Sequence, residues 1–510
     1  MKSPIRLFFI IAIAAFTGCT AGRKSFNPDK KYPASQLKED LAVLRQILEK
    51  FHPSIYWYTS KDSMDQYFDY YAQAIKDSMT ESDFGFHIVA PVLTAIRCGH
   101  TSFNFSKAYS KFLANKRLPT FPLGLKVWSD SMVVTFNFNR RDSIFKRGTI
   151  VTGINLWNNR RIIDTFFNYL PADGYSQNVN YIRLSSAFGY YHRNIFGLSK
   201  NYAVQYIDST GQEKLAALPL YTPATDSMGS LPPGTKPPAR PPRETERGPS
   251  RLEMRRSFRV DTARQLGIMT INTFGSGAHL NSFYKKTFKW LRKHHIKNLV
   301  IDVRNNGGGD INHFAQLSSY IRNEPLKVAD TAAAVINHFG PSRKYFQYHF
   351  FNSMAFFFLT SKRDDGRYHF RYWENHEYKP KGKNHYNGNV YVLISGPSFS
   401  ATTLFAQSVK GQSNVTLVGE EAGGGAHGNN GIMIPNITLP NTRLRVRMPL
   451  FRLVQYNHPP KDGHGVQPDV LVPPTVDGIR RGVDLKMEKV MSWIQPVSYT
   501  HLTLPTICSV

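Results

Sequence analysis

The segment VLISGPSFSATT spans Val392 to Thr403, and the segment LVIDVRNNGGGD spans Leu299 to Asp310. Each is a short apolar run, typical of a buried parallel strand, that ends abruptly in small residues before a helix-like pattern. The first segment carries Ser400 to a strand-to-helix turn, and the second carries three glycines to a strand end. A serine beside backbone N–H groups is the minimal equipment for acyl transfer. Together they predict an α/β core that holds a candidate site.

Strand-like and helix-like segments alternate from residue 251 to residue 475, as they do in α/β domains. We expect strands at 266–271, 298–303, 390–395 and 415–418, and helices at 280–294, 311–321 and 402–410. A C-terminal helix is expected over 476–495. The aromatic and basic insert 323–388 receives no assignment.

Two further domains are expected before this core. Residues 35–118 are expected to form a helical domain, since apolar side chains recur at 3/4 spacing from residue 35 to residue 96, and the last helix is expected to break at Gly99. Residues 119–221 resemble a PDZ-like peptide-binding module, although an unrelated β-rich module would give the same outline. Its expected elements are strands at 123–127, 131–138, 149–154 and 203–206 and a helix at 161–169. The proline-rich stretch 222–250 is expected to be a linker.

The first nineteen residues predict export. A basic start precedes an apolar run over 7–16, which is too short to cross a bilayer that needs about 20 helical residues. The run ends at Thr-Gly-Cys19, which resembles the bacterial lipobox, where the cysteine is lipidated; an ordinary signal peptide over 1–19 is the alternative. We expect 20–34 to be a tether and the protein to be lipid-anchored in the bacterial cell envelope, on the periplasmic side of the outer membrane.

The formal net charge is +28, from 64 basic and 36 acidic residues among 510. The basic residues are spread along the chain without a nucleic-acid-binding motif, so a basic exterior facing an anionic envelope is expected rather than a nucleic-acid partner. Cysteine occurs only at Cys19, Cys98 and Cys508, and no metal-type spacing or H-E-x-x-H motif occurs. We therefore expect no metal and no cofactor. Residues 496–510 resemble translated sequencing-adapter sequence and are set aside.

Each candidate residue also has a structural interpretation. Ser400 suits the N-cap of a helix as well as a nucleophile. The glycines at 307–309 lack the G-x-G-x-x-G spacing of a dinucleotide loop, which leaves an oxyanion hole or a tight turn. His100 is the most plausible base because it follows the expected helix break directly.

Four ordered motifs resemble the tail-specific (C-terminal-processing) serine peptidases. They lie at 299–310, 390–410, 418–425 and 463–470. The resemblance implies an α/β catalytic core of the crotonase-like type and places the nucleophile on Ser400. One branch of this family uses a lysine base, but Gly425 occupies the lysine position here. The Ser–Lys dyad is therefore absent.

A second branch, which resembles tricorn protease and the interphotoreceptor retinoid-binding proteins, also lacks that lysine. Its proteolytic members take a histidine base from the N-terminal helical region, in a context similar to CGHTS at 98–102, which implies His100 as the general base. Those sites have a serine where Gly99 stands. The resemblance further implies Asp462 as the orienting acid. An oxyanion hole would use the backbone N–H of Ala401 with that of Gly307 or Gly308.

The expected protein is a multidomain α/β envelope lipoprotein: a serine endopeptidase (a hydrolase) that cleaves protein or peptide substrates through an acyl-enzyme on Ser400. The same scaffold also carries ligand-binding relatives, so a non-catalytic peptide- or lipid-binding protein is the alternative, and an esterase is a third. Because His100 lies about 300 residues before Ser400, the site is expected to form only where two domains meet.

Overall fold

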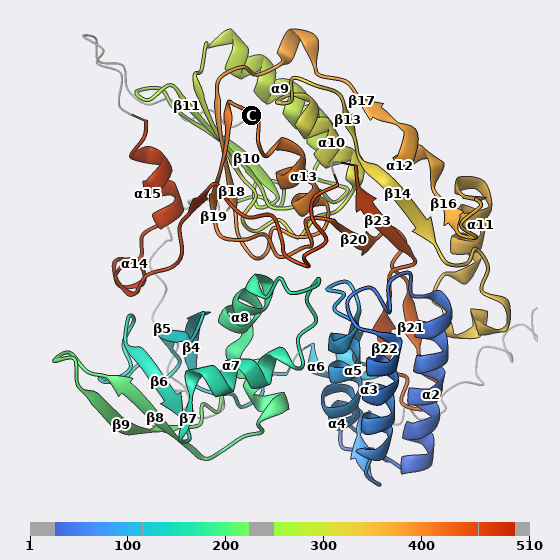
Figure 1. The fold of residues 1–510 in the computed structure, drawn as a ribbon. Helices are drawn as coiled ribbons and strands as arrows, with labels where there is room; N and C mark the ends of the chain where they lie inside the picture. The colour runs from blue at the N-terminus through green and yellow to red at the C-terminus, as the bar shows by residue number, and fades with distance from the viewer. Residues whose placement is uncertain (1–25, 115, 224–248, 457, 495–510) are drawn as a thin grey trace, which may run out of the picture.

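The computed structural model describes residues 26–114, 116–223, 249–456 and 458–494. Figure 1 shows an α/β core in the upper half, with a β-rich module and a helical domain side by side beneath it. The leader with Cys19, most of the proline-rich linker and the tail from 495 onward lie outside the described residues. Within the described ranges, no helix is both long and apolar enough to cross a membrane.

The core is built on a six-stranded sheet that is parallel except at one edge. Consecutive residues of its strands are buried on opposite faces: Leu299 and Ile301 pack into the large core, and Val300 packs into a smaller one. This two-sided burial is why the strands read as unbroken apolar runs. In order, the sheet comprises β10 (Arg256–Asp261), β11 (Leu266–Ile271), β12 (Asn298–Asp302), β18 (Asn389–Ile394), β19 (Val415–Gly419) and β24 (Val470–Leu471), and only the β10–β11 pair is antiparallel.

Helices cover both faces of this sheet. The side chains of α9 (Leu280–Lys293), α10 (Ile311–Ser319) and α13 (Ala401–Val409) fill the large core, as the sequence predicts. The expected single helix over 476–495 is wrong. Gly482, with φ of 69°, ends α14 (Val476–Arg481), and a separate α15 (Leu485–Met491) packs on the smaller core.

The unassigned insert contributes to a second sheet of the core. This sheet comprises, in order, β15 (Ser361–Lys362), β16 (Tyr368–His369), β14 (Ala329–Ala334), β23 (Phe451–Gln455) and β20 (Gly428–Gly431). The insert also supplies α11 (His349–Leu359), α12 (Arg371–Asn375) and the short pair β13 (Leu326–Lys327) and β17 (Glu377–Tyr378).

The helical domain shares its core with the α/β core. Its elements are β1 (Lys31–Tyr32), α2 (Ala34–Phe51), α3 (Lys61–Gln73), β2 (Met79–Thr80), α4 (Glu81–Phe84), a π-helical turn at Gly85–Val89, α5 (Ala90–Ala95), β3 (Ser102–Asn104) and α6 (Lys107–Leu113). One apolar cluster includes both Leu44 and Leu404. Strand β3 pairs with β22 (Arg445–Arg447), which pairs with β21 (Asn436–Thr438), and buried Asp40 accepts hydrogen bonds from Thr442. These contacts fix the chain on both sides of His100.

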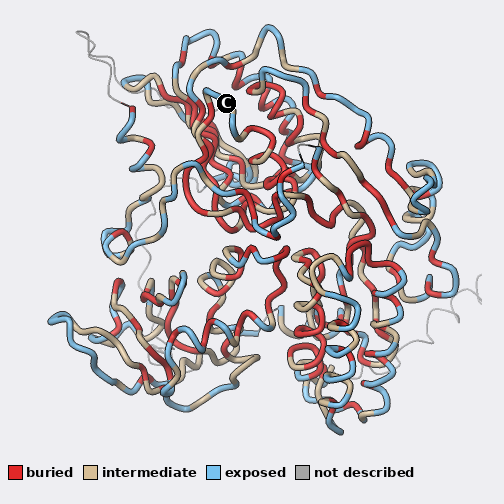
Figure 2. Tube along the Cα trace, viewed as in Figure 1, coloured by how far each residue is buried: buried red, intermediate tan, exposed pale blue. Residues whose placement is uncertain are grey.

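The β-rich module has an apolar core of its own. It comprises β4 (Leu123–Trp128), β5 (Ser131–Asn137), β6 (Ile150–Ile154), β7 (Trp157–Asn158), α7 (Asn159–Phe167), α8 (Asn178–Ile195), β8 (Asn201–Ile207) and β9 (Glu213–Pro219). The expected strands and first helix are present, but α8 was not expected. Figure 2 shows buried chain where this module, the helical domain and the core meet.

Candidate functional site

Ser400 occupies the turn between β18 and α13 in a backbone conformation that few serines adopt. Its φ of 57° and ψ of −123° lie in a region that is costly for a residue with a Cβ. It stands at the N-cap position of α13, yet its side chain makes no capping hydrogen bond. Within the described ranges its hydroxyl has no hydrogen-bond partner. The geometry therefore favours the nucleophile interpretation over the helix-cap interpretation.

The glycine run packs directly against this turn. A Cβ on Gly308, which has φ of 95°, would lie 2.8 Å from the Ser400 Cβ and 3.0 Å from the Ala401 nitrogen. Only glycine fits that approach. The Gly308 N–H donates to the Asn306 side-chain oxygen at 2.9 Å, whereas Gly307 is exposed and open. Of the expected oxyanion donors, Ala401 and Gly307 are therefore better placed than Gly308.

Replacing Gly308 with alanine is expected to lower any activity that depends on Ser400 by about 100-fold or more, because the new methyl group would enter the turn that carries Ser400. Gly411→Ala is the matched control, since Gly411 also has positive φ (83°) but has nothing within 4 Å of its Cβ position. Both variants should lose about 1 kcal/mol of stability or more through backbone strain. Equal activity in the two folded variants would contradict the placement of Gly308.

His100 lies against the residue that precedes Ser400. The ring centroids of His100 and Phe399 are 4.7 Å apart, and a Cβ on Gly99 would come within 2.7 Å of the Phe399 ring. A serine at position 99 would thus displace Phe399, which explains the glycine. The helix before His100 ends at Ala95, and positive φ at Arg97 makes the break that was expected at Gly99.

The imidazole of His100 is buried and electrically neutral. The side chain is 6% exposed, and burial together with Arg447 and Arg183 lowers its pKa to about 3. Its Nδ1 is buried without a hydrogen-bond partner among the described residues. A neutral imidazole can accept a proton, so its protonation state suits a general base.

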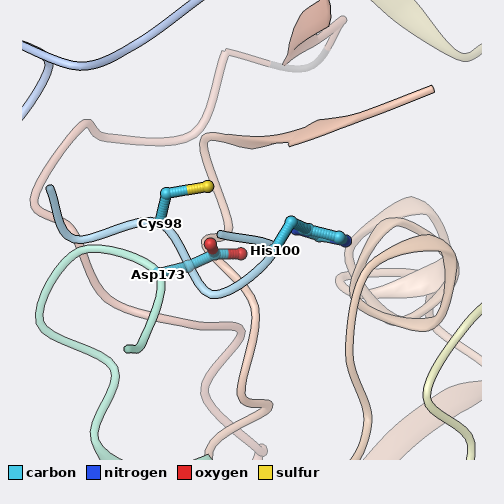
Figure 3. A group of neighbouring side chains, drawn as sticks. All are labelled: Cys98, His100 and Asp173. Carbon is cyan, nitrogen blue, oxygen red and sulfur yellow. The ribbon is translucent and has the colours of Figure 1, made fainter. Parts of the chain in front are cut away.

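Asp173 is the residue that sequence reasoning missed. Figure 3 shows its carboxylate beside His100 and Cys98, and their ligand atoms lie within 4.8 Å of one another. The Gly99 N–H donates to Asp173 Oδ1 at 2.7 Å, while Oδ2 is buried without a partner in the part of the chain that is described. Asp173 is 4% exposed, and burial raises the pKa of its carboxyl to about 6. Asp173 Oδ2 and His100 Nδ1 are thus two buried polar atoms of this group that have no hydrogen-bond partner among the described residues.

The segment around Asp173 belongs to the β-rich module and is hydrogen-bonded to both the helical domain and the α/β core. The Gly174 N–H donates to the Arg97 carbonyl at 3.0 Å. The Tyr175 N–H donates to the Gly463 carbonyl at 2.8 Å, and the Ser176 hydroxyl donates to the Ala422 carbonyl at 2.9 Å. No local sequence pattern could have revealed Asp173, because these partners lie far from it in the chain.

Asp462 lies on the surface of its own loop. Its carboxylate accepts the His464 N–H at 2.8 Å, and none of the described contacts joins it to His100 or Ser400. Gly425, at the position of the absent lysine, faces Asp173 instead: a Cβ there would lie 3.9 Å from the Asp173 Cβ. The backbone N–H of Gly425 also favours the ionised form of Asp173, and so holds its pKa below what burial alone would give.

Cys98, His100 and Asp173 are also a set that could hold a metal ion, which the sequence spacing did not reveal. In the absence of a metal ion, burial raises the pKa of the Cys98 thiol to about 12, so a metal ion would have to displace its proton on binding.

A cavity of about 330 Å³ is lined by residues of the helical domain and of the β-rich module. Its wall includes Ser102 and Phe103 of β3 and Pro171, close in sequence to His100 and Asp173. Most of the remaining wall is aromatic or aliphatic, with Arg183 as the charged group: Phe86, Phe105, Tyr169, Tyr190, Tyr191 and Arg183.

Comparison with known proteins gives the following matches. Residues 265–472 match the model described as Peptidase family S41. The fold is similar to that of mature CPAF complexed with lactacystin, with a TM-score of 0.61 and 15% identity over 90% of this chain and 97% of that one. Mature CPAF itself gives a TM-score of 0.58 and 14% identity over 88% and 94%. No curated protein sequence matches this chain.

Proposed function

Because the chain belongs to the tail-specific S41 family of serine peptidases, we propose that it hydrolyses peptide bonds through an acyl-enzyme on Ser400. His100 is the general base, and Asp173 positions His100. The observation that carries the proposal is the backbone of Ser400: a strained turn that leaves the hydroxyl unbonded, packs on Gly308 and follows Phe399, which touches His100.

In this mechanism the proton of Ser400 moves to His100 as the hydroxyl oxygen attacks the peptide carbonyl carbon. Burial keeps the imidazole neutral before the reaction, and a neutral imidazole has a free ring nitrogen for that proton. The resulting imidazolium is stabilised by the ionised carboxylate of Asp173, whose free Oδ2 can accept from Nδ1 after a small closure of the group. His100 then passes the proton to the leaving amine, and water hydrolyses the acyl-enzyme.

The oxyanion of the tetrahedral intermediate would be held by the backbone N–H groups of Ala401 and Gly307. Ala401 N–H is at the start of α13, where the helix dipole also favours negative charge. Each such donor is typically worth about 2.7–4 kcal/mol in the transition state. Gly308 shapes the turn rather than donating, because its N–H is engaged by Asn306.

The aromatic cavity, whose wall includes Ser102 and Pro171, suits a large apolar side chain of the substrate. Its volume of about 330 Å³ is enough for one aromatic residue, and its wall continues directly from β3. We therefore expect cleavage near aromatic or long aliphatic residues.

The cellular setting and the module's role are part of the same proposal. Cys19 in its lipobox-like context supports a lipid anchor in the bacterial envelope.

The β-rich sheet with a helix along its edge strand supports a PDZ-like module. In that module the Val127 N–H of β4 donates a hydrogen bond to the Ser185 hydroxyl of α8 at 2.9 Å. A peptide strand added beside β4 would need this N–H, so α8 competes with such a peptide.

Incubation of the full chain with reduced and alkylated casein tests this function. New peptide N-termini, found by mass spectrometry and concentrated beside large apolar residues, are the expected result. A binding protein would leave casein intact, and an esterase would cleave an ester substrate but not casein. Either outcome would contradict the proposed peptidase.

A further inference from the structure

Helix α11 exposes more apolar surface than any other helix of the described chain. Phe357 is 78% exposed and Phe358 is 73% exposed, in a protein whose other large apolar side chains are mostly buried. The α11 face consists of Phe350, Phe351, Met354, Phe357, Phe358 and Leu359. Figure 2 shows this helix as exposed chain at the edge of the core. An apolar patch of this kind marks a surface that another body covers.

A single buried side chain fixes α11 to the core. Phe356 stacks on Phe451 of β23 with ring centroids 5.4 Å apart, and its ring lies 6.1 Å from that of Phe339. The other residues of the helix are half-buried or exposed. An 11-residue helix is marginal in water without such packing, and a helix that is apolar on nearly all sides is usually buried in protein or lipid.

The chain that flanks α11 is positively charged. Arg343 and Lys344 precede the helix, Lys362 and Arg363 follow it, and all four are exposed. From residue 340 to residue 363 the sequence contains no aspartate or glutamate, and the exposed Asp364 and Asp365 follow directly. Only Arg363 has a carboxylate partner, Glu374 at 2.6 Å. The apolar face is therefore bordered by cations.

This charge decides between the two plausible occupants. A second copy of the chain in a symmetric contact would bring the same cations of both copies together, which is unfavourable. An anionic lipid surface offers complementary charge to the cations and an apolar layer to the phenylalanines. At about 1.5 Å per residue, α11 is roughly 16 Å long and can lie along the bilayer surface but cannot cross it.

We propose that α11 inserts its apolar face into the headgroup region of an anionic bilayer, with Arg343, Lys344 and Lys362 on lipid phosphates. This contact is independent of Ser400 and of any acyl chain on Cys19. With a lipid anchor present, it would add a second attachment point and so fix the orientation of the protein on the membrane.

Vesicle flotation of the full chain carrying Cys19→Ser, which removes the lipidation site, tests this proposal. Binding is expected to vesicles with phosphatidylglycerol and to be much weaker with phosphatidylcholine alone or at 0.5 M salt. The pair Phe357→Ser and Phe358→Ser should lower the partition coefficient at least 10-fold. The pair Phe136→Ser and Leu215→Ser is the matched control, since these side chains are also exposed but lie on the β-rich module. It should change partitioning by less than about threefold.

All variants keep the leader, so its contribution to binding is common to them, and a cooperative thermal unfolding transition in each variant checks that it is folded. Equal vesicle binding by the α11 pair and by the control pair would overturn the proposal. So would a lipid-free dimer, seen by light scattering, that the α11 substitutions dissociate, because a second copy would then be the occupant.

Discussion

Replacing Ser400 with alanine is expected to lower kcat/KM for peptide hydrolysis by a factor on the order of 10⁴ or more while the protein stays folded. The substitution removes the atom that forms the acyl-enzyme. Since the Ser400 hydroxyl neither caps α13 nor bonds elsewhere in the described chain, its loss should change the free energy of unfolding by about 0.5 kcal/mol or less. Rates on a casein-derived peptide and the Tm of both proteins measure the two effects separately.

Ser398→Ala is the matched control, two residues away. The Ser398 hydroxyl is fully buried, donates to the Val303 carbonyl at 2.9 Å and accepts the Ser395 N–H at 3.1 Å. Its removal should cost about 1–3 kcal/mol of stability and leave the folded protein within about tenfold of the wild-type rate. A Ser400→Ala protein that keeps more than about 1% of the wild-type rate would mean that another group is the nucleophile.

Replacing Asp173 with asparagine is expected to make the protein less active but more stable at neutral pH. Asparagine can still accept the Gly99 N–H, but it cannot stabilise an imidazolium, so kcat/KM should fall by about 10²–10⁴. The gain in stability arises because the variant no longer buries a charge. A purely structural role for Asp173 would give the opposite sign for stability.

The pH dependence of that stability follows from the raised pKa of Asp173. Between the ordinary value of 3.8 and the folded value of about 6, the folded state binds more protons than the unfolded state. Wild-type stability therefore falls as the pH rises through this window, by up to about 3 kcal/mol, and the Asn variant lacks this loss. The two Tm values should be similar near pH 4 and should diverge, with the variant higher, by pH 7. Activity of the wild type should decline below about pH 6 as Asp173 becomes protonated.

Asp462→Asn distinguishes the two acidic candidates. Asp462 is exposed and bonded within its own loop, so its replacement should lower kcat/KM by less than about tenfold and leave the Tm unchanged within about 2 °C. A larger loss of activity for Asp462→Asn than for Asp173→Asn would assign the orienting role to Asp462, as the family resemblance implies.

The strands of the core could be predicted because both faces of the sheet are buried, which makes consecutive residues of each strand apolar. The segment 266–271 was expected as a strand and is β11 to the residue. Ser400 could be located because the small residues between an apolar strand and a helix-like pattern mark the turn that joins the two elements. His100 needed the family resemblance as well, since a histidine after a helix has no local signature of catalysis.

Asp173 and the place of the insert in the core could not be predicted because both depend on distant contacts, whereas α8 was missed for a local reason. The Asp173 carboxylate accepts hydrogen bonds from the backbone N–H of Gly99, 74 residues earlier in the chain, and from that of Gly425, which lies in the core. Helix α8 buries Asn180 and His192 along with its apolar residues, which obscures the helical pattern. Strand β14 of the insert pairs with β23, which lies more than a hundred residues later.

Labelling with a fluorophosphonate tests most directly the claim that Ser400 is a nucleophile activated by His100. Digestion of the labelled full chain and tandem mass spectrometry should place one phosphonyl group on Ser400, and His100→Gln should slow the labelling at least 100-fold. An unlabelled folded protein, or an adduct on a different serine with Ser400 unmodified, would contradict the account.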